Sequence, residues 1–129
     1  MKSSYNLNIA SLVEMHLESK VLHWQTKKYA MHVALGDFYS AMDALIDKFV
    51  ETSQSKYGRV SFDRNINIKN LSEFNSMVDL VKQYITPFET FLITELVKPL
   101  DEEVDSDLFN LRDEMLSELN KLKYLLTLK

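Results

Sequence analysis

Residues 22–51 read LHWQTKKYAMHVALGDFYSAMDALIDKFVE, and this stretch decides how the chain folds and what it can bind. It holds two imidazoles, His23 and His32, and two carboxylates in the pattern Asp47-x-x-x-Glu51. Residues four apart are neighbours on a helix, so the two acids are predicted to share one helical face. Imidazole and carboxylate together form a ligand set that suits iron or zinc. The stretch therefore predicts a helical hairpin that carries metal ligands.

The apolar residues around this stretch recur at helical spacing. They predict a first helix over residues 7–27 and a second over residues 29–53. The periodicity is then lost over residues 54–70, which predicts a crossover loop.

Turn and cap signals divide the second half of the chain into two further helices. Asn70 followed by Glu73 resembles a capping box at the start of the third helix. Pro87 lies inside that helix, where a missing N–H and a steric clash predict a kink or break. Pro99 is expected to end the segment, and the fourth helix is expected to begin near Asp105. Four amphipathic helices with one long crossover between the second and third predict an all-α four-helix bundle.

The composition supports a single helical domain over residues 1–129. With only 2 Gly and 2 Pro the chain has few turn formers for a β fold, and the absence of cysteine excludes disulfides and Cys-type zinc sites. A net charge of −4 disfavours direct DNA binding, which needs a cationic surface. The sequence shows no apolar signal-peptide core and no apolar run of about 18 residues, so a cytoplasmic protein without membrane association is expected.

The distance along the second helix limits where a metal site can form. At about 1.5 Å rise per residue, His32 and Asp47 are expected to lie about 22 Å apart, too far to share one ion within a chain. His23 lies near the hairpin turn and is equally distant from Asp47. Two alternatives stay open: the four residues serve unrelated purposes, or the site forms between two chains packed about a two-fold axis.

A ferritin-type di-iron site inside one bundle requires Glu-x-x-His on two helices. No such motif occurs, because the residues three places before the three histidines are Val13, Lys20 and Tyr29. His16 is interpreted as a structural residue.

The quoted stretch resembles the core of the Dps proteins, the starvation-induced mini-ferritins. In that family a His-Trp closes the first helix, a second His opens the next, and an Asp-x-x-x-Glu follows fifteen residues later, as His32 and Asp47 do here. The resemblance is strong over residues 7–52. Residues 71–128 resemble only the architecture of a little-characterised group of short ferritin-like proteins, some of them in viral genomes.

The resemblance implies a ferritin-like four-helix bundle and a ferroxidase site at a two-fold interface. Asp47 and Glu51 would come from one subunit, with His23 and His32 from its mate and Trp24 beside the site. The implied function is that of a Dps-like iron-binding protein, a possible ferroxidase that oxidises Fe(II) with hydrogen peroxide or O₂ and sequesters the product. A dodecameric homo-oligomer is also implied, and zinc would be a substitute metal. Metal capture is expected to fall as the pH drops through the histidine range.

Several residues depart from the mini-ferritin pattern. The interval from His23 to His32 is shorter, and Lys27-Lys28 stands in place of the usual turn glycine. Gly36 occupies the position of a further acid, for which Asp43 is a possible substitute. These departures favour a second hypothesis, a non-catalytic ferritin-like structural or oligomerising protein. A zinc-stabilised dimer without turnover is a third.

Overall fold

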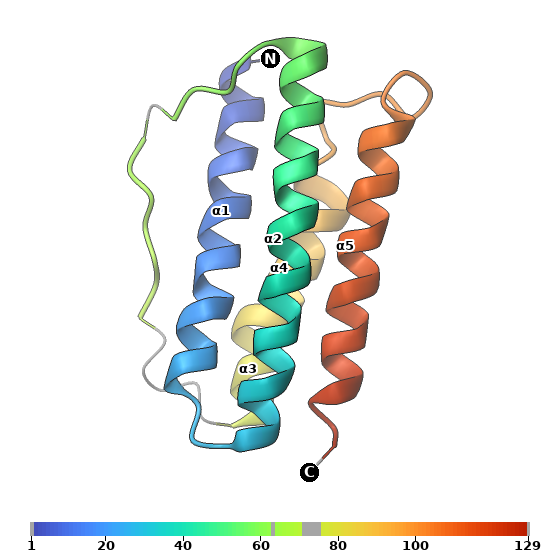
Figure 1. The fold of residues 1–129 in the computed structure, drawn as a ribbon. Coiled ribbons are helices and arrows are strands. Elements are labelled where there is room, and N and C mark those ends of the chain that lie inside the picture. Colours follow the sequence, from blue (N-terminus) through green and yellow to red (C-terminus); the bar gives the residue numbers. More distant parts are fainter. Residues whose placement is uncertain (1, 63, 71–75, 129) are drawn as a thin grey trace.

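The computed structural model describes residues 2–62, 64–70 and 76–128, and helices are the only regular elements within those ranges (Figure 1). The predicted all-α class is therefore confirmed. None of the helices described combines the length and the apolar character that a membrane span requires.

The first two helices form an antiparallel hairpin (Figure 1). Helix α1 covers Lys2–Gln25 and helix α2 covers Tyr29–Tyr57, close to the predicted ranges. In the turn between them, the Thr26 hydroxyl accepts a hydrogen bond from the Lys28 N–H at 3.2 Å. The Thr26 N–H itself donates to the Leu22 carbonyl, 3.1 Å away. The short turn is thus held without a glycine.

Helix α2 extends one turn beyond its predicted end. Gly58 terminates it with a φ of 89°, a value that favours glycine because it has no Cβ. The Gly58 N–H still donates to the Gln54 carbonyl at 2.9 Å, so helical bonding continues up to this residue. Residues 54–57, predicted as loop, are consequently helical.

The crossover that follows α2 lies along α1 (Figure 1), and Glu14 of α1 attaches it. The two Glu14 oxygens accept hydrogen bonds from the Arg64 guanidinium at 2.8 and 3.0 Å. The same carboxylate accepts the Asn67 N–H at 2.7 Å. The Arg64 contact lowers the pKa of Glu14. This bidentate pair fixes the long connection against the hairpin.

A second carboxylate of α1, Glu18, is buried at the same interface. Its side chain is 4% exposed, and one oxygen accepts the Lys69 N–H at 3.3 Å. The other oxygen is buried and has no hydrogen-bond partner. Burial raises the pKa of Glu18, and the Lys69 bond and charge offset this only in part.

The third segment is one continuous helical run that contains two wide π-helical turns. Its described start is capped by Ser76, whose hydroxyl accepts the Asp79 N–H at 3.1 Å. The capping box predicted at Asn70 and Glu73 extends outside the described residues. The segment consists of α3 (Met77–Leu80), η1 (Val81–Ile85), α4 (Thr86–Thr90) and η2 (Phe91–Glu95).

A kink or break was expected at Pro87, and the chain does not break there, because the wide turn before it accommodates the proline. The Thr86 N–H donates to the Val81 carbonyl, five residues back. Pro87 has no N–H to offer to the preceding turn. The Lys69 ammonium instead donates to the Gln83 carbonyl at 3.0 Å. The chain therefore stays helical through Pro87 and ends its helix at Glu95, before Pro99, as predicted.

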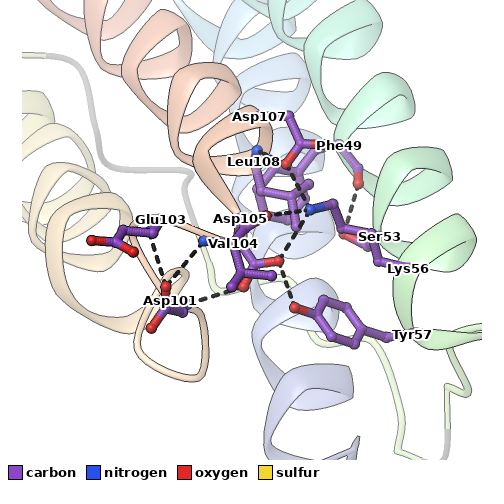
Figure 2. Close-up of polar contacts among 10 residues, drawn as sticks. All are labelled: Phe49, Ser53, Lys56, Tyr57, Asp101, Glu103, Val104, Asp105, Asp107 and Leu108. Carbon is purple, nitrogen blue, oxygen red and sulfur yellow. Dashed lines mark hydrogen bonds and ion pairs between the residues drawn. The ribbon is translucent and has the colours of Figure 1, made fainter.

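Helix α5 (Ser106–Leu125) begins where the sequence predicted, after Asp105. Asp105 is 1% exposed and joins the end of α2 to the start of α5 (Figure 2). Its carboxylate accepts hydrogen bonds from the Tyr57 hydroxyl at 2.5 Å, the Lys56 ammonium at 3.3 Å and the Asp101 N–H at 3.0 Å. Burial alone would raise the pKa of Asp105, but these hydrogen bonds outweigh it and lower the pKa.

Arg112 of α5 satisfies carbonyl groups near the end of the third segment. Its guanidinium donates to the Leu92 and Ile93 carbonyls at 3.1 and 3.2 Å, and its Nε contacts Asp113 at 2.9 Å. Helix ends leave such carbonyls without intrahelical donors.

All four helical segments contribute to one apolar core. The aromatic rings of Phe38, Phe88 and Tyr84 meet edge to face within it, at centroid separations of 6.1 and 5.7 Å. Further fully buried side chains are Ile9, Leu12, Leu35, Met42, Phe49, Leu80, Ile85, Leu92, Leu96 and Leu108. The core occupies the space between the segments, and the exposed acids Asp43, Asp47 and Glu51 of α2 lie outside it.

Candidate metal centre

His23 and His32 meet where the α1–α2 hairpin turns. His23 belongs to the last turn of α1, and His32 to the first turn of α2. Their rings are stacked, with centroids 3.8 Å apart and planes inclined by 17°. The two imidazoles therefore belong to one hairpin, as the sequence predicts, and their rings are in contact.

Each ring hydrogen-bonds the backbone of the other residue. The His23 Nδ1 lies 2.5 Å from the His32 carbonyl oxygen, and the His32 Nδ1 lies 2.7 Å from the His23 carbonyl oxygen. A carbonyl can only accept, so both Nδ1 atoms must carry the proton. In the neutral rings, both Nε2 atoms then keep an unshared electron pair. This is the arrangement that metal-binding histidines commonly adopt, with the non-ligating nitrogen donating to a carbonyl or carboxylate.

Gly36 provides the space that the His23 ring occupies. A Cβ placed on Gly36 would lie 2.9 Å from the His23 Cε1 and 3.1 Å from its Nδ1. In the sequence, Gly36 stands where the mini-ferritin pattern has an acid. The structure gives a physical reason: a side chain at this position would displace the imidazole.

Tyr39 is a neighbour of the site that the sequence analysis missed. Its ring meets the His23 ring edge-on at 5.2 Å and the His16 ring at 6.5 Å. The Lys20 ammonium lies 5.2 Å from the Tyr39 ring centre. The available signal was its position seven residues after His32, which places both residues on the same side of the helix.

Asp47 and Glu51 lie farther along α2 and are exposed to solvent. A hydrogen bond and charge repulsion from Asp47 raise the pKa of Glu51, so the two carboxyl groups are close enough to share a proton or a cation. Helix α2 is unbroken between His32 and Asp47. At about 1.5 Å per residue they are separated by about 22 Å, as predicted.

The imidazoles and the acids are therefore not brought together within one chain. Among the described residues, no group of three or more histidine, aspartate or glutamate side chains is placed to hold a metal ion. His23 and His32 lie close together, and so do Asp47 and Glu51, but the two pairs are far apart along α2.

His16 contacts a carboxylate on the same outer side of the hairpin. Its Nε2 lies 3.4 Å from an Asp43 oxygen, and its Nδ1 is buried without a hydrogen-bond partner. Burial lowers the pKa of His16, the Asp43 charge raises it, and the Lys20 charge lowers it further. A neutral ring with its proton on Nε2 fits these surroundings.

Fold and site together define an all-helical protein with an ordered pair of imidazoles at one end of a helical hairpin. Residues 23–126 match the family of unknown function DUF5856, and the chain belongs to that family. The matched region begins at His23 and includes His32, Asp47 and Glu51. No curated protein and no solved structure matches the chain significantly.

Proposed function

We propose that this protein is a ferritin-like, Dps-related protein that captures Fe(II) between two subunits and oxidises it. The observation that carries the proposal is the reciprocal bonding of His23 and His32. It directs both Nδ1 protons toward backbone carbonyls and leaves an unshared electron pair on each Nε2 of the neutral rings. Each Nε2 therefore has an electron pair available to a metal ion, in the arrangement that is common among metal-binding histidines.

The topology supports the ferritin-like part of the proposal. The crossover returns the chain along α1, so that the third segment runs parallel to α2 and α5 runs antiparallel to it (Figure 1). One long connection between the second and third helices distinguishes ferritin-like bundles from simple up-and-down bundles.

A two-fold dimer would bring the two halves of the ligand set together. An axis near the middle of α2, perpendicular to the helix, places the His32 end of one subunit beside the Asp47 end of the other. Two equivalent sites result, each with two imidazoles and two carboxylates. The carboxylates would balance the cationic charge, which also removes the repulsion between Asp47 and Glu51.

Iron is the substrate in the proposed reaction, because imidazole and carboxylate ligands suit it. Two Fe(II) ions give one electron each to one hydrogen peroxide molecule, whose O–O bond breaks to form two waters with the uptake of two protons. The chain's residues bind and orient the ions, and carboxylates favour the more highly charged Fe(III) product. Assembly into a dodecameric shell, which the Dps resemblance implies, would retain that product.

The test is anaerobic addition of Fe(II) to purified protein, followed by peroxide, with ferric absorbance and particle size recorded. We expect saturable oxidation that Asp47→Ala abolishes while the oligomer is retained. Asp37→Ala is a matched control, because Asp37 is an exposed acid of the same helix that lies on the α5 side. An assembled wild-type protein without saturable oxidation would contradict the proposal.

Exposed apolar side chains near the imidazole pair favour a second candidate, a non-catalytic oligomerising protein. Trp24 is 66% exposed, Tyr29 80% and Val33 40%. Such a cluster suits a subunit interface whether or not metal is bound. A zinc-bound dimer without turnover is a variant of this candidate. Elemental analysis of the purified oligomer separates the variants, because zinc or no metal, without iron oxidation, supports the structural role.

A further inference from the structure

Two carboxylates of α1 attach the crossover by accepting the N–H groups of alternate residues. Glu14 accepts the Asn67 N–H at 2.7 Å. Glu18, one helical turn farther along, accepts the Lys69 N–H at 3.3 Å. Four residues of a helix rise about 6 Å, and two residues of an extended chain span about 6.6 Å. The crossover, which follows α1 in Figure 1, therefore meets both acids in register.

The two acids differ in how their charge is compensated. Both Glu14 oxygens contact the Arg64 guanidinium, at 2.8 and 3.0 Å, and this ion pair lowers the pKa of Glu14. Glu18 is only 4% exposed, and one of its oxygens is buried without a hydrogen-bond partner. A buried carboxylate with an unpaired oxygen is costly in its charged form. The attached crossover therefore favours an ionised Glu14 and a protonated Glu18.

The described titratable groups around Glu18 compensate its charge only in part. Burial is the largest influence and raises the pKa of Glu18; the Lys69 N–H and charge lower it, and the Glu14 charge raises it further. From η1, the buried Tyr84 donates its hydroxyl to the Met15 carbonyl at 2.7 Å. Burial raises the pKa of Tyr84 well above its ordinary value, so this hydroxyl stays neutral. Moving the crossover away is therefore the change that lets water solvate an ionised Glu18.

We propose that the crossover is a proton-controlled strap, held closed on α1 by Glu14 and Glu18 and opened locally when either contact fails. Ionisation of Glu18 releases Lys69, because the open form lets water solvate the buried charge. Protonation of Glu14 releases Arg64, because it ends the ion pair. The proposal goes beyond the iron chemistry proposed above and does not depend on it.

The two contacts depend on pH with opposite signs. The pKa of Glu18 is raised in the closed form, so its contact is complete below the ordinary glutamate pKa and is lost as the pH rises through the raised one. The pKa of Glu14 is lowered, so its contact is complete above the ordinary glutamate pKa and is lost as the pH falls through the lowered one. The strap is therefore held most firmly near the ordinary glutamate pKa.

Opening at Glu18 also acts on the third segment, through the Lys69 side chain. The Lys69 ammonium donates to the Gln83 carbonyl of η1 at 3.0 Å. The α-helical donor to this carbonyl would be the N–H that Pro87 lacks, so Lys69 replaces it. Releasing Lys69 removes this donor from a π-helical turn, a feature often found at functional sites. The strap thus connects the protonation of an α1 carboxylate to the conformation of the third segment.

Amide hydrogen exchange, recorded by NMR as protection factors between about pH 4 and pH 8, tests the strap. The Lys69 amide should be protected at least about tenfold less than that of Leu12, a core residue of α1, because local opening requires less free energy than global unfolding. Its protection should fall by up to about tenfold per pH unit between the ordinary and the raised pKa of Glu18, and then level off. Equal protection of the two amides would show that the crossover opens only with the whole fold, and would overturn the proposal. Protection of Lys69 that does not change with pH would do the same.

Isosteric variants assign each contact. Glu18→Gln stays neutral, so the protection of Lys69 should no longer fall on the alkaline side, while the loss on the acidic side remains. Glu14→Gln should remove the loss on the acidic side. Glu114→Gln changes an exposed acid of α5 and is a matched control that should behave as wild type does. An alkaline loss that persists in Glu18→Gln would show that another group controls the crossover, and the proposal would be wrong.

The Thr86 amide, which donates to the Val81 carbonyl across η1, reports on the connection to the third segment. Its protection should fall together with that of Lys69 in the wild type. In Lys69→Ala, which keeps the backbone N–H but has no ammonium, the protection of Thr86 should no longer follow the ionisation of Glu18. The same pH response of Thr86 in both proteins would show that the third segment does not respond to the strap through Lys69.

Discussion

Replacing Gly36 with alanine tests the geometry of the imidazole pair, because two effects of opposite sign meet at this position. Alanine is favoured over glycine inside a helix by about 1 kcal/mol. The new Cβ, however, would lie 2.9 Å from the His23 Cε1, whereas ordinary contacts begin near 3.4 Å. The ring must therefore move by several tenths of an ångström.

The displaced ring loses its alignment with the His32 carbonyl. A side-chain hydrogen bond of this kind contributes about 0.5–1.5 kcal/mol net to stability. The gain in helix propensity and the lost bond thus nearly cancel, and the expected change in unfolding free energy is within about 1 kcal/mol of zero. Co(II) binding should nevertheless fall at least about tenfold, because the His23 ring leaves the orientation that its Nδ1 bond to the His32 carbonyl fixes.

A double-mutant cycle separates these two effects. In a His23→Ala background no ring opposes the new Cβ, so Gly36→Ala should stabilise the protein by the full propensity difference of about 1 kcal/mol. Urea denaturation of the four proteins measures the coupling, and Co(II) titration measures the binding. Equal stabilisation in both backgrounds, with unchanged Co(II) affinity, would refute the packing of His23 on Gly36.

Two further predictions concern buried carboxylates. Burial raises the pKa of Glu18 in the folded protein, so stability is lost as the pH rises from the ordinary glutamate pKa through the raised one. Glu18→Gln should therefore be more stable than wild type at pH 8, and its unfolding free energy from urea denaturation should depend less on pH. A steeper loss of stability with pH in the variant would contradict this. Asp105 has a lowered pKa, so its stabilisation is complete above the ordinary aspartate value and is lost as the pH falls through the lowered one. Asp105→Asn should lower the unfolding free energy by about 2–4 kcal/mol at pH 7. Asp107→Asn, whose exposed side chain also contacts Lys56, should lower it much less, because solvent screens that ion pair. Similar losses in the two variants would show that Lys56, rather than the buried carboxylate, holds α5 to α2.

Apolar periodicity was sufficient to predict the two helices of the hairpin, because each buries a continuous stripe, and its loss predicted the crossover. Proline chemistry alone was not sufficient at Pro87, where the outcome depends on a π-helical turn and on Lys69, a residue far away in the sequence. The attachment of the crossover by Glu14 could not be predicted either, since its partner Arg64 is fifty residues away in the sequence. Pairings over such distances leave no periodic signal in a single sequence.

Only part of the candidate site could be predicted from the sequence. Residues along one helix have a fixed separation, so the distance between His32 and Asp47 followed from the sequence alone. The stacking of His23 on His32, and the role of Gly36 beneath it, depend on how the turn folds. That turn contains no glycine and no proline to indicate its shape.

The nine-residue separation of His23 and His32 affects the order in which the molecule assembles. Closing so short a loop costs little chain entropy, and contacts of low sequence separation form early in folding. The hairpin precedes the third segment and α5 in the sequence, so it leaves the ribosome before them, and earlier segments tend to fold first. The imidazole pair can therefore be set before the third segment and α5 have been synthesised, so its stacking does not depend on the rest of the bundle.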